Sequence, residues 1–451
     1  MIRRIIRALL RIALRVYFRR IEVTGLENVP RDSPVIFVLN HPNALVDPVF
    51  LLCLAPRRVA FIAKAPLFRM PVIGYLVRAM DSLPAYRRQD EGQDVSRNIE
   101  TFTAARALLA RGVTIGICPE GVSHDEPRLK PLKTGAARIA LAAASSGHAI
   151  DLKIVPVGLY YTEKTTFRSS ALLYFAEGLP VKRVALEPDG SPPREAVREL
   201  SDRIETALRE VMLHAEQEEA LSLIARAEQI FSAAEVDEHD EEQDLVRSLE
   251  LRQRFLEGYA FYRSHSPGQL DAIEARIARF EFELKEAGID PSDLSLPPTA
   301  AHTIFRLLAQ VSTCVLLAPL ALFGVAVHYP AYRLAGYLSR RLARHEQDVL
   351  STFKIISAML LFPLTWILVA IVSWRVAGWL SGAAMMILTP LCGYVAVRFF
   401  EEIDRFFGSF VALALFVTRR RSFVRLLAER AAIHREILAL GSEAEPLIEA
   451  V

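Results

Sequence analysis

Short apolar runs alternate with longer amphipathic stretches between residues 21 and 190. Five runs have the length and composition of buried strands: 35–40, 58–63, 113–118, 152–160 and 171–176. Four stretches between them repeat apolar residues at the spacing of a helix: 48–55, 67–79, 96–111 and 133–146. Strands that alternate with helices of this length predict an α/β domain with a mainly parallel sheet and flanking helices.

The pattern changes after residue 190. Proline and glycine mark a boundary at 188–193, and charged helical patterns then fill the region 191–300, at 193–233, 240–265 and 267–287. The acid-rich segment 235–244 is typical of a solvated surface. We expect a charged helical insert that joins the α/β domain to the apolar remainder of the chain.

The region 301–400 holds three apolar stretches: 303–329, 355–373 and 377–397. The last two approach the ~20 residues that cross a bilayer core, and a polar turn is expected between them at 373–375. Arginines flank the pair, so the positive-inside tendency predicts a transmembrane hairpin with both ends in the cytoplasm. Pro319 interrupts the first stretch, which we expect to be re-entrant or interfacial. The alternative is that all three are core helices of a soluble protein.

Both ends of the chain carry basic, apolar-striped helical patterns. Residues 1–20 contain no acidic residue and an arginine at every fourth position: Arg3, Arg7, Arg11, Arg15 and Arg19. These arginines interrupt the apolar positions, which excludes a secretory signal, and the pattern predicts a helix in an anionic membrane interface. The alternative is an amphipathic helix packed on the α/β domain. Region 401–451 is expected to form an interfacial helix, at 406–430, and a C-terminal tail.

Composition supports a membrane protein and excludes several other classes. Hydrophobic residues make up 52% of the 451 residues, and the mean hydropathy is +0.24. A net charge of +2 gives no broad basic field, so no nucleic-acid partner is expected. The spacing of the four cysteines predicts neither a metal site nor a disulfide framework: Cys53, Cys118, Cys314 and Cys392. Nothing in the sequence indicates an oligomeric state.

A histidine and an aspartate closely follow the first predicted strand. His41 and Asp47 lie six positions apart in Asn-His-Pro-Asn-Ala-Leu-Val-Asp. Ligands of open α/β sheets bind at the carboxyl ends of strands, where a histidine can take a proton from a hydroxyl and a carboxylate can orient its ring. The alternative is structural: Asp47 would cap a helix that begins at Pro48, and His41 would hydrogen-bond a loop.

Three further pieces place polar residues beside predicted strands. Lys64 and Arg87 follow short apolar runs, where cations suit a phosphate, although exposed charges are more often plain surface. Glu120 and Gly121 form a tight turn directly after a strand, and glycine permits both positive φ and close approach of a ligand. Pro156 lies within the fourth run and should occupy a sheet edge or a strand end.

These four pieces, in this order and at this spacing, resemble the phospholipid/glycerol acyltransferase family. That family's first motif is Asn-His followed by aspartate, its second ends in arginine, its third is Phe-Pro-Glu-Gly, and its fourth is an apolar strand with a proline. The matches lie within about residues 20–190, at His41 and Asp47, Arg87, Glu120 and Gly121, and Pro156. The wording of the first and third motifs is similar to that of the subgroup that includes fungal glycerol-3-phosphate/dihydroxyacetone-phosphate acyltransferases.

The sequence departs from the common family pattern at several points. Five residues separate His41 from Asp47 instead of four, a spacing that the fungal-type subgroup shares. Asp81 stands where the second motif usually opens with glycine, Cys118 replaces an aromatic residue in the third, and Val122-Ser123 replaces Thr-Arg. These departures concern the specificity for the alcohol more than the chemistry.

The resemblance implies the glycerolipid acyltransferase fold and a role for each matched residue. His41 would remove the proton from the acceptor hydroxyl, and Asp47 would fix the tautomer of its ring. Arg87, with Lys64, would hold the acceptor phosphate, and Glu120 with Gly121 would shape its site. The co-substrate would be acyl-CoA or acyl-carrier protein, and the transfer would need no cofactor, no metal and no covalent acyl-enzyme.

The implied function is that of a membrane-bound O-acyltransferase in phospholipid biosynthesis. The acceptor would be glycerol 3-phosphate or dihydroxyacetone phosphate, the partners would be membrane lipids, and the active site would face the cytoplasm. The runner-up acceptor is lysophosphatidate (1-acylglycerol 3-phosphate) or another lysophospholipid. An alternative of another class is a catalytically inactive membrane scaffold, which the presence of His41, Asp47, Arg87 and Glu120 argues against.

Overall fold

The computed structural model divides the chain into two compact units, residues 1–214 with 339–355 and residues 215–338 with 356–451, which are described separately. The described residues are 2–87, 90, 94–124, 126, 128–146, 151–212, 220, 223, 224, 226, 227, 245–288, 294, 300–343 and 347–448. The acid-rich segment 235–244 and the end of the predicted helical stretch 193–233 lie outside them.

The first unit contains an eight-stranded sheet in the order β1-β7-β6-β2-β5-β3-β4, with β8 paired to β6. The strands are β1 (Arg20–Thr24), β2 (Val35–Leu39), β3 (Val59–Lys64), β4 (Leu83–Ala85), β5 (Thr114–Ile117), β6 (Lys153–Tyr161), β7 (Ser170–Phe175) and β8 (Leu179–Pro180). The pairs of β6 with β7 and β8 are antiparallel, and the other five pairs are parallel. The predicted mainly parallel sheet is confirmed, although the sequence pattern missed the short strands β1, β4 and β8.

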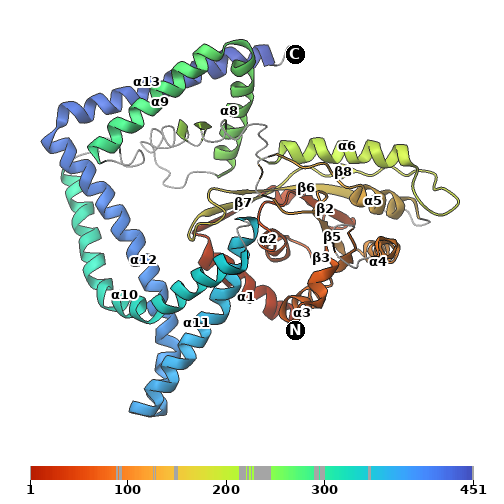
Figure 1. Ribbon diagram of the computed structural model, residues 1–451, viewed down its shortest axis with the longest axis horizontal. Coiled ribbons are helices and arrows are strands. Elements are labelled where there is room, and N and C mark those ends of the chain that lie inside the picture. The colour runs from red at the N-terminus through yellow and green to blue at the C-terminus, as the bar shows by residue number, and fades with distance from the viewer. Residues whose placement is uncertain are drawn as a thin grey trace. The chain divides into compact units, whose positions relative to one another are not determined.

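Helices cover both faces of this sheet (Figure 1). They are α1 (Ile2–Tyr17), α2 (Val46–Leu54), α3 (Pro71–Ala79), α4 (Asn98–Ala110), α5 (Gly135–Ser145) and α6 (Arg194–Glu210), with short 3-10 turns η1 (Leu26–Asn28), η2 (Ala65–Arg69) and η3 (Val95–Arg97). Alternate residues of a strand point to opposite faces, and all five residues of β2 are buried. Phe37 packs with residues of α1 and α2, whereas Ile36 packs with residues of α4, α5 and α6.

Pro156 was predicted to lie at a sheet edge or a strand end, but it lies in the interior of β6. It pairs in register with Val38 of β2, and its carbonyl oxygen accepts a 2.9 Å hydrogen bond from the Ala176 N–H on the other side. On that side the neighbour of β6 changes from β8 to β7. The missing N–H of the proline therefore faces the connection between two strands, where no ladder hydrogen bond is lost.

Three of the arginines of α1, Arg3, Arg7 and Arg11, bind groups of the protein. Arg7 and Arg11 donate to the Cys53 carbonyl oxygen at 3.0 and 2.5 Å, one of the carbonyls at the end of α2 that lack an intrahelical partner. Arg3 donates to the Val59 carbonyl oxygen at 2.7 Å and pairs with Asp81. Packing of α1 on the α/β domain, the alternative, is confirmed.

The side of α1 that these contacts leave open is apolar. Five large aliphatic side chains on this side are 42–59% exposed: Ile2, Ile5, Leu9, Ile12 and Val16. Their spacing of three and four residues places them on one face of the helix. A membrane-interface role for residues 1–20 stays a prediction, and an apolar stripe rather than an arginine stripe would make that contact.

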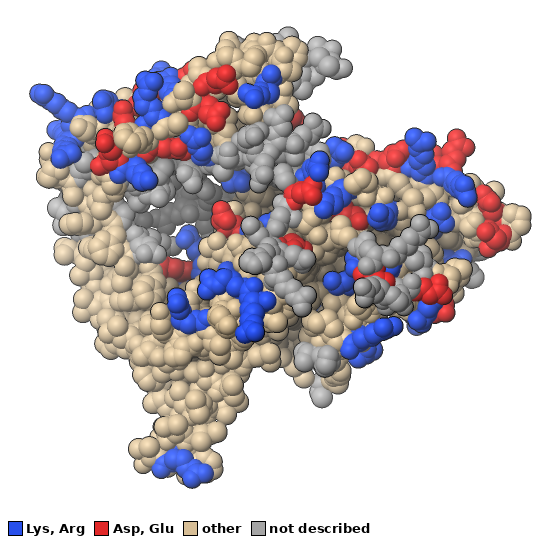
Figure 2. Space-filling model, in the orientation of Figure 1, with Lys and Arg blue, Asp and Glu red and all other residues tan. Residues whose placement is uncertain are grey.

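The second unit carries three helices that are long and apolar enough to cross a membrane by length and composition: Leu308–Ala343, Asp348–Ala377 and Trp379–Ile403, the first two of which begin or end in residues of the first unit. They belong to α10 (Ala300–Ala343), α11 (Gln347–Ala377) and α12 (Trp379–Thr418). On the face that Figure 2 shows, the projecting end of α11 and α12 is almost free of charge except at its tip. The chain reverses at Gly378, where φ is 88°, and not at 373–375, which is helical. The stretch 303–329 is continuous helix through Pro319, which leaves no re-entrant turn there, and the interfacial alternative stays a prediction.

The charged helices of the second unit form a cluster of their own. The predicted stretches 240–265 and 267–287 correspond to α8 (Leu245–His265) and α9 (Pro267–Ala287), which pack with α13 (Arg420–Ile448). Ile277 and Phe280 of α9 are buried against residues that include Phe423 of α13. Arg276 adds ion pairs with Glu429, at 2.7 Å, and Glu436.

Candidate functional site

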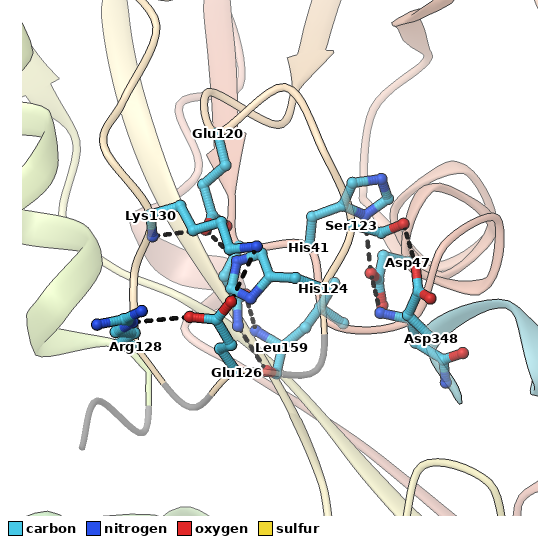
Figure 3. Close-up of polar contacts among 12 residues, drawn as sticks. His41, Asp47, Glu120, Ser123, His124, Glu126, Arg128, Lys130, Leu159 and Asp348 are labelled. Atoms are coloured by element: carbon cyan, nitrogen blue, oxygen red, sulfur yellow. Dashed lines mark hydrogen bonds and ion pairs between the residues drawn. The ribbon is translucent and has the colours of Figure 1, made fainter. Parts of the chain in front are cut away.

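His41 and Asp47 meet at the carboxyl end of β2, as the sequence pattern suggested. The His41 Nδ1 lies 2.9 Å from the Asp47 Oδ2, and the two side chains are 17% and 0% exposed. With Nδ1–H donating to the carboxylate, the neutral ring keeps its Nε2 lone pair for another partner. Figure 3 shows the two side chains facing each other.

The six-residue spacing is accommodated by a strained turn between the two residues. Ala44 has a φ of 37°, a backbone conformation that costs a residue with a side chain about 1–3 kcal/mol. The turn also brings the Asn43 N–H to the Asp47 Oδ2 at 2.7 Å. Helix α2 begins at Val46, so Asp47 lies in the first helical turn and is not the cap residue that the alternative interpretation required.

Leu159 and Tyr161 of β6 hold the segment that contains His41 and Asp47 by hydrogen bonds. The Asn40 side chain exchanges two hydrogen bonds with the Leu159 backbone, at 3.0 and 2.8 Å, which fastens the end of β2 to β6. Leu39 pairs with Val157, so β6 continues beyond β2 and carries Tyr161 over the loop. The Tyr161 hydroxyl donates to the Asp47 Oδ1 at 2.6 Å. The buried carboxylate therefore has three donors.

The environment of the pair shifts three protonation equilibria. Burial alone would lower the pKa of the His41 ring, but the hydrogen bond with the Asp47 carboxylate and the charge of that carboxylate raise it well above its ordinary value. Burial raises the pKa of the Cys118 thiol, although His41 opposes that shift. Burial and the Asp47 carboxylate raise the pKa of the Tyr161 hydroxyl, which keeps it a donor.

Glu120 lies in the turn after β5 and is occupied by its own loop. Its side chain is 1% exposed, and its Oε2 contacts the His124 Nε2 and accepts the Lys130 N–H at 2.9 Å. Among the described residues, no partner binds the buried Glu120 Oε1. The His124 N–H donates to the His41 carbonyl oxygen at 3.2 Å, so the first and third motifs are joined directly.

Arg87 reaches the third motif from the region beyond β4. Its Nη1 donates to the Gly121 carbonyl oxygen at 2.6 Å, and Gly121 has the positive φ of 75° that only glycine adopts without strain. The rest of its guanidinium fork is paired with Asp90, at 2.9 and 2.7 Å. Lys64 ends β3 in register with Ala85, and its side chain is exposed.

The site thus contains residues that sequence reasoning missed. Tyr161 and Cys118 contact the His41–Asp47 pair from segments that are far away in the chain. His124 holds Glu120 from four positions away in the same loop. The Ser123 hydroxyl also donates to Asp348 of α11, within the same unit (Figure 3). Within the described part of the chain, no group of three or more histidine, cysteine, aspartate or glutamate side chains could hold a metal ion.

Two family models match the chain. The acyltransferase model covers residues 20–160, and the model of the glycerol-3-phosphate acyltransferase 2 C-terminal domain covers residues 237–449. The first match includes β1 to β5, all of β6 except Tyr161, and every predicted site residue. The second covers α8 to α13, including the apolar helices.

Known relatives match very different shares of the chain. Glycerol-3-phosphate O-acyltransferase 1 of Saccharomyces cerevisiae is 25% identical over 78% of this chain, which spans 58% of that relative's length. An uncharacterized acyltransferase of Schizosaccharomyces pombe is 23% identical over 97% of this chain and 80% of its own. A chloroplastic 1-acyl-sn-glycerol-3-phosphate acyltransferase of Brassica napus is 30% identical, but over only 33% of this chain and 39% of its own.

The hydrogen bond from Tyr161 to Asp47 makes a testable contribution to stability. In Tyr161→Phe one oxygen of a buried carboxylate loses its donor, which should cost about 1–3 kcal/mol of folding free energy. The measurement is the thermal midpoint of the detergent-solubilised protein, with Tyr174→Phe on the neighbouring β7 as the matched control. Equal midpoints for the two variants would contradict the contribution.

Proposed function

Because the chain belongs to the phospholipid/glycerol acyltransferase family, we propose that it transfers a fatty acyl group from acyl-CoA or acyl-carrier protein to glycerol 3-phosphate or dihydroxyacetone phosphate. The observation that carries this proposal is the His41 Nδ1 contact with a fully buried Asp47 at the carboxyl edge of the sheet. Such a pair activates an alcohol. The product would be a phospholipid precursor.

The reaction begins at the Nε2 of His41. Nε2 takes the proton of the acceptor hydroxyl while the oxygen attacks the thioester carbonyl, and Asp47 stabilises the imidazolium that forms. The tetrahedral intermediate collapses by breaking the carbon–sulfur bond, and the imidazolium returns its proton to the leaving thiolate. The ester oxygen therefore comes from the acceptor, and the released product is the free thiol.

Direct transfer fits this site better than an acyl-enzyme. Cys118 lies beside His41, but burial raises the pKa of its thiol, and the neutral thiol is a poor nucleophile. The acceptor hydroxyl can instead use the same base without an intermediate bound to the protein. This supports the proposal that no covalent step is needed.

Arg87, Lys64, Glu120 and Gly121 are proposed to bind the acceptor. A guanidinium fork matches two phosphate oxygens, and Arg87 touches the Gly121 carbonyl next to Glu120. The Oε1 of Glu120, which has no partner among the described residues, suits a glycerol hydroxyl as donor. The match of residues 237–449 to a glycerol-3-phosphate acyltransferase C-terminal model favours the small acceptor over lysophosphatidate, because the relative of that name from Brassica napus matches only a third of the chain.

The proposed setting is a membrane, with the acyltransferase domain at residues 21–190 and the site facing the cytoplasm. The three apolar helices support membrane insertion. The basic residues that flank α11 and α12, among them Arg340, Arg341, Arg419 and Arg420, support a cytoplasmic side for both flanks. Membrane lipids would then surround the enzyme and receive its product.

The proposal is tested by acyl transfer in membranes that contain the protein. Labelled glycerol 3-phosphate and lysophosphatidate are supplied separately with long-chain acyl-CoA, to the wild type and to His41→Ala. We expect transfer to glycerol 3-phosphate that falls at least a hundredfold in the variant, in line with the ~10²–10⁴-fold contribution of a general base. His265→Ala, at an exposed histidine of α8, is the control.

The other outcomes each change the proposal in a defined way. Transfer to lysophosphatidate alone would keep the mechanism and replace the acceptor. Transfer to glycerol 3-phosphate that survives in His41→Ala would remove His41 as the base. If the folded protein transfers no acyl group to either acceptor, from acyl-CoA or from acyl-carrier protein, the catalytically inactive scaffold is the remaining hypothesis.

The pH dependence of the reaction should follow the raised pKa of His41. The base works only when neutral, so the rate should fall as the pH drops through a pKa above the ordinary value of about 6.5. In Asp47→Asn the carboxylate that favours the imidazolium is lost. The acidic limb should then move to lower pH while the maximal rate falls. A limb that stays in place in this variant would show that Asp47 does not set the pKa of His41.

Asp90 should compete with the acceptor phosphate for Arg87. Both N–H groups that its carboxylate binds belong to the guanidinium fork, so a phosphate must replace it to bind in the same way. We expect Asp90→Asn to lower the KM for glycerol 3-phosphate several-fold and to leave the KM for acyl-CoA unchanged. A higher KM for glycerol 3-phosphate would mean that Asp90 orients Arg87 instead.

A further inference from the structure

The start of α11 presents a polar face to the loops of the first unit. Asp348, Ser351 and Thr352 are 9%, 0% and 6% exposed, and their spacing of three and four places them on one side of the helix. Ile355, one turn further, packs against the core cluster that includes residues of α1 and α2. All four residues belong to the first unit, although the family model that covers them is that of the C-terminal domain.

Thr352 contacts the turn that joins His41 to Asp47. Its Oγ1 accepts a hydrogen bond of 3.2 Å from the Leu45 N–H. Leu45 precedes α2 and directly follows Ala44, the residue with the strained positive φ. A strained backbone persists only where surrounding contacts hold it. The contacts around Ala44 include the hydrogen bonds from the Asn43 N–H to Asp47, from the Leu45 N–H to Thr352 and from the Val46 N–H to the Asn43 carbonyl oxygen.

Two further loops at the same edge of the sheet are held by neighbouring residues of α11. Asp348 accepts a hydrogen bond from the Ser123 hydroxyl in the third motif. Ser351 donates to the Lys164 carbonyl oxygen, and the Lys354 amine donates to the Thr165 carbonyl oxygen at 2.6 Å, both in the connection from β6 to β7. These loops follow β2, β5 and β6, whose carboxyl ends lie side by side because the three strands are parallel.

We propose that the first two turns of α11 are a positioning element of the active site, in which Thr352 holds the turn between His41 and Asp47 in its strained conformation. Thr352 touches no reacting atom and acts through the backbone of Leu45. The inference rests on the proposed function for its effect on rate. It assigns a part of the acyltransferase site to a segment of the C-terminal family region.

The physical reason is that the turn sets the distance between His41 Nδ1 and Asp47 Oδ2. Only one of the two oxygens of Asp47 contacts His41, and the same oxygen accepts from Asn43 within the turn. Relaxation of Ala44 toward an unstrained φ would move Asn43 and His41 together relative to α2. When the base is displaced from its orienting carboxylate, the kcat of the enzyme falls while its affinity for either substrate is unchanged.

The test compares Thr352→Val, which keeps the shape and removes the hydroxyl, with Thr352→Ser, which keeps the hydroxyl. We expect Thr352→Val to lower kcat about tenfold, as for one lost hydrogen bond, with both KM values within about twofold of wild type. Thr352→Ser should restore kcat. Thr365→Val is the matched control, because the Thr365 hydroxyl donates to the Leu361 carbonyl of the same helix, at 2.9 Å, and has no other partner among the described residues.

Hydrogen–deuterium exchange of the peptide that contains residues 40–47 gives a second readout that does not require activity. Exchange at the Leu45 amide should be faster in Thr352→Val and near wild type in Thr352→Ser. If Thr352→Val does not fold, Ser123→Ala tests the other contact of the same face, with an expected fall in kcat of about threefold.

The outcomes separate this inference from the proposed function. Unchanged exchange, or faster exchange with an unchanged kcat, would overturn the positioning role, as would a loss confined to KM or an equal loss in Thr365→Val. A wild type that transfers no acyl group would overturn the proposed function instead. The exchange rate at Leu45 would then still decide whether Thr352 holds the turn.

Discussion

The buried carboxylate of Asp47 is the constraint on which the rest of the site depends. A charge that is removed from water must be paired and hydrogen-bonded, or it is neutralised. Here the donors are the His41 ring, the Asn43 N–H and the Tyr161 hydroxyl, at 2.6–2.9 Å. They come from the end of β2, from the turn and from the end of β6, so one solvation requirement fixes three segments. The same requirement orients the His41 ring and leaves its Nε2 lone pair for a substrate.

The local patterns of the sequence were sufficient for the sheet and for part of the site. The five predicted strands all form. His41 and Asp47 meet at the end of a central parallel strand, where the buried carboxylate needs hydrogen-bond donors. Tyr161 could not be found in the same way, because its role depends on β6 extending past β2. The predicted position of Pro156, at a sheet edge or a strand end, was wrong for a related reason. The register of β6 decides that Pro156 faces the gap between β7 and β8, and no local pattern reveals the register.

The N-terminal helix shows how tertiary contacts can decide which face of an amphipathic helix is exposed. A stripe of arginines suggests anionic lipid, but the carbonyls at the end of α2 and the Asp81 carboxylate were nearer partners. A helix end leaves carbonyl groups unsatisfied and carries partial negative charge. Once Arg3, Arg7 and Arg11 satisfy these groups, the aliphatic stripe from Ile2 to Val16 becomes the exposed side. Polarity along the helix was predictable, whereas the direction in which each face points was not.

Helix α11 shows that the two family regions do not coincide with the two compact units, because its first turns belong to the C-terminal family region and to the first unit. Its first turns are polar and buried in the first unit, and its apolar part begins near Ile356, where the second unit resumes. The polar residues satisfy backbone groups of the strand-end loops, such as the Leu45 N–H and the Lys164 carbonyl, which have no helix or sheet partner of their own. A chain that ended after β8 would lack the Thr352 contact with the Leu45 N–H and the Ser351 contact with the Lys164 carbonyl oxygen, and the turn at Ala44 would depend on its contacts within the α/β region. The separation of about 300 residues between Leu45 and Thr352 is the reason that no motif search within the α/β region finds this contact.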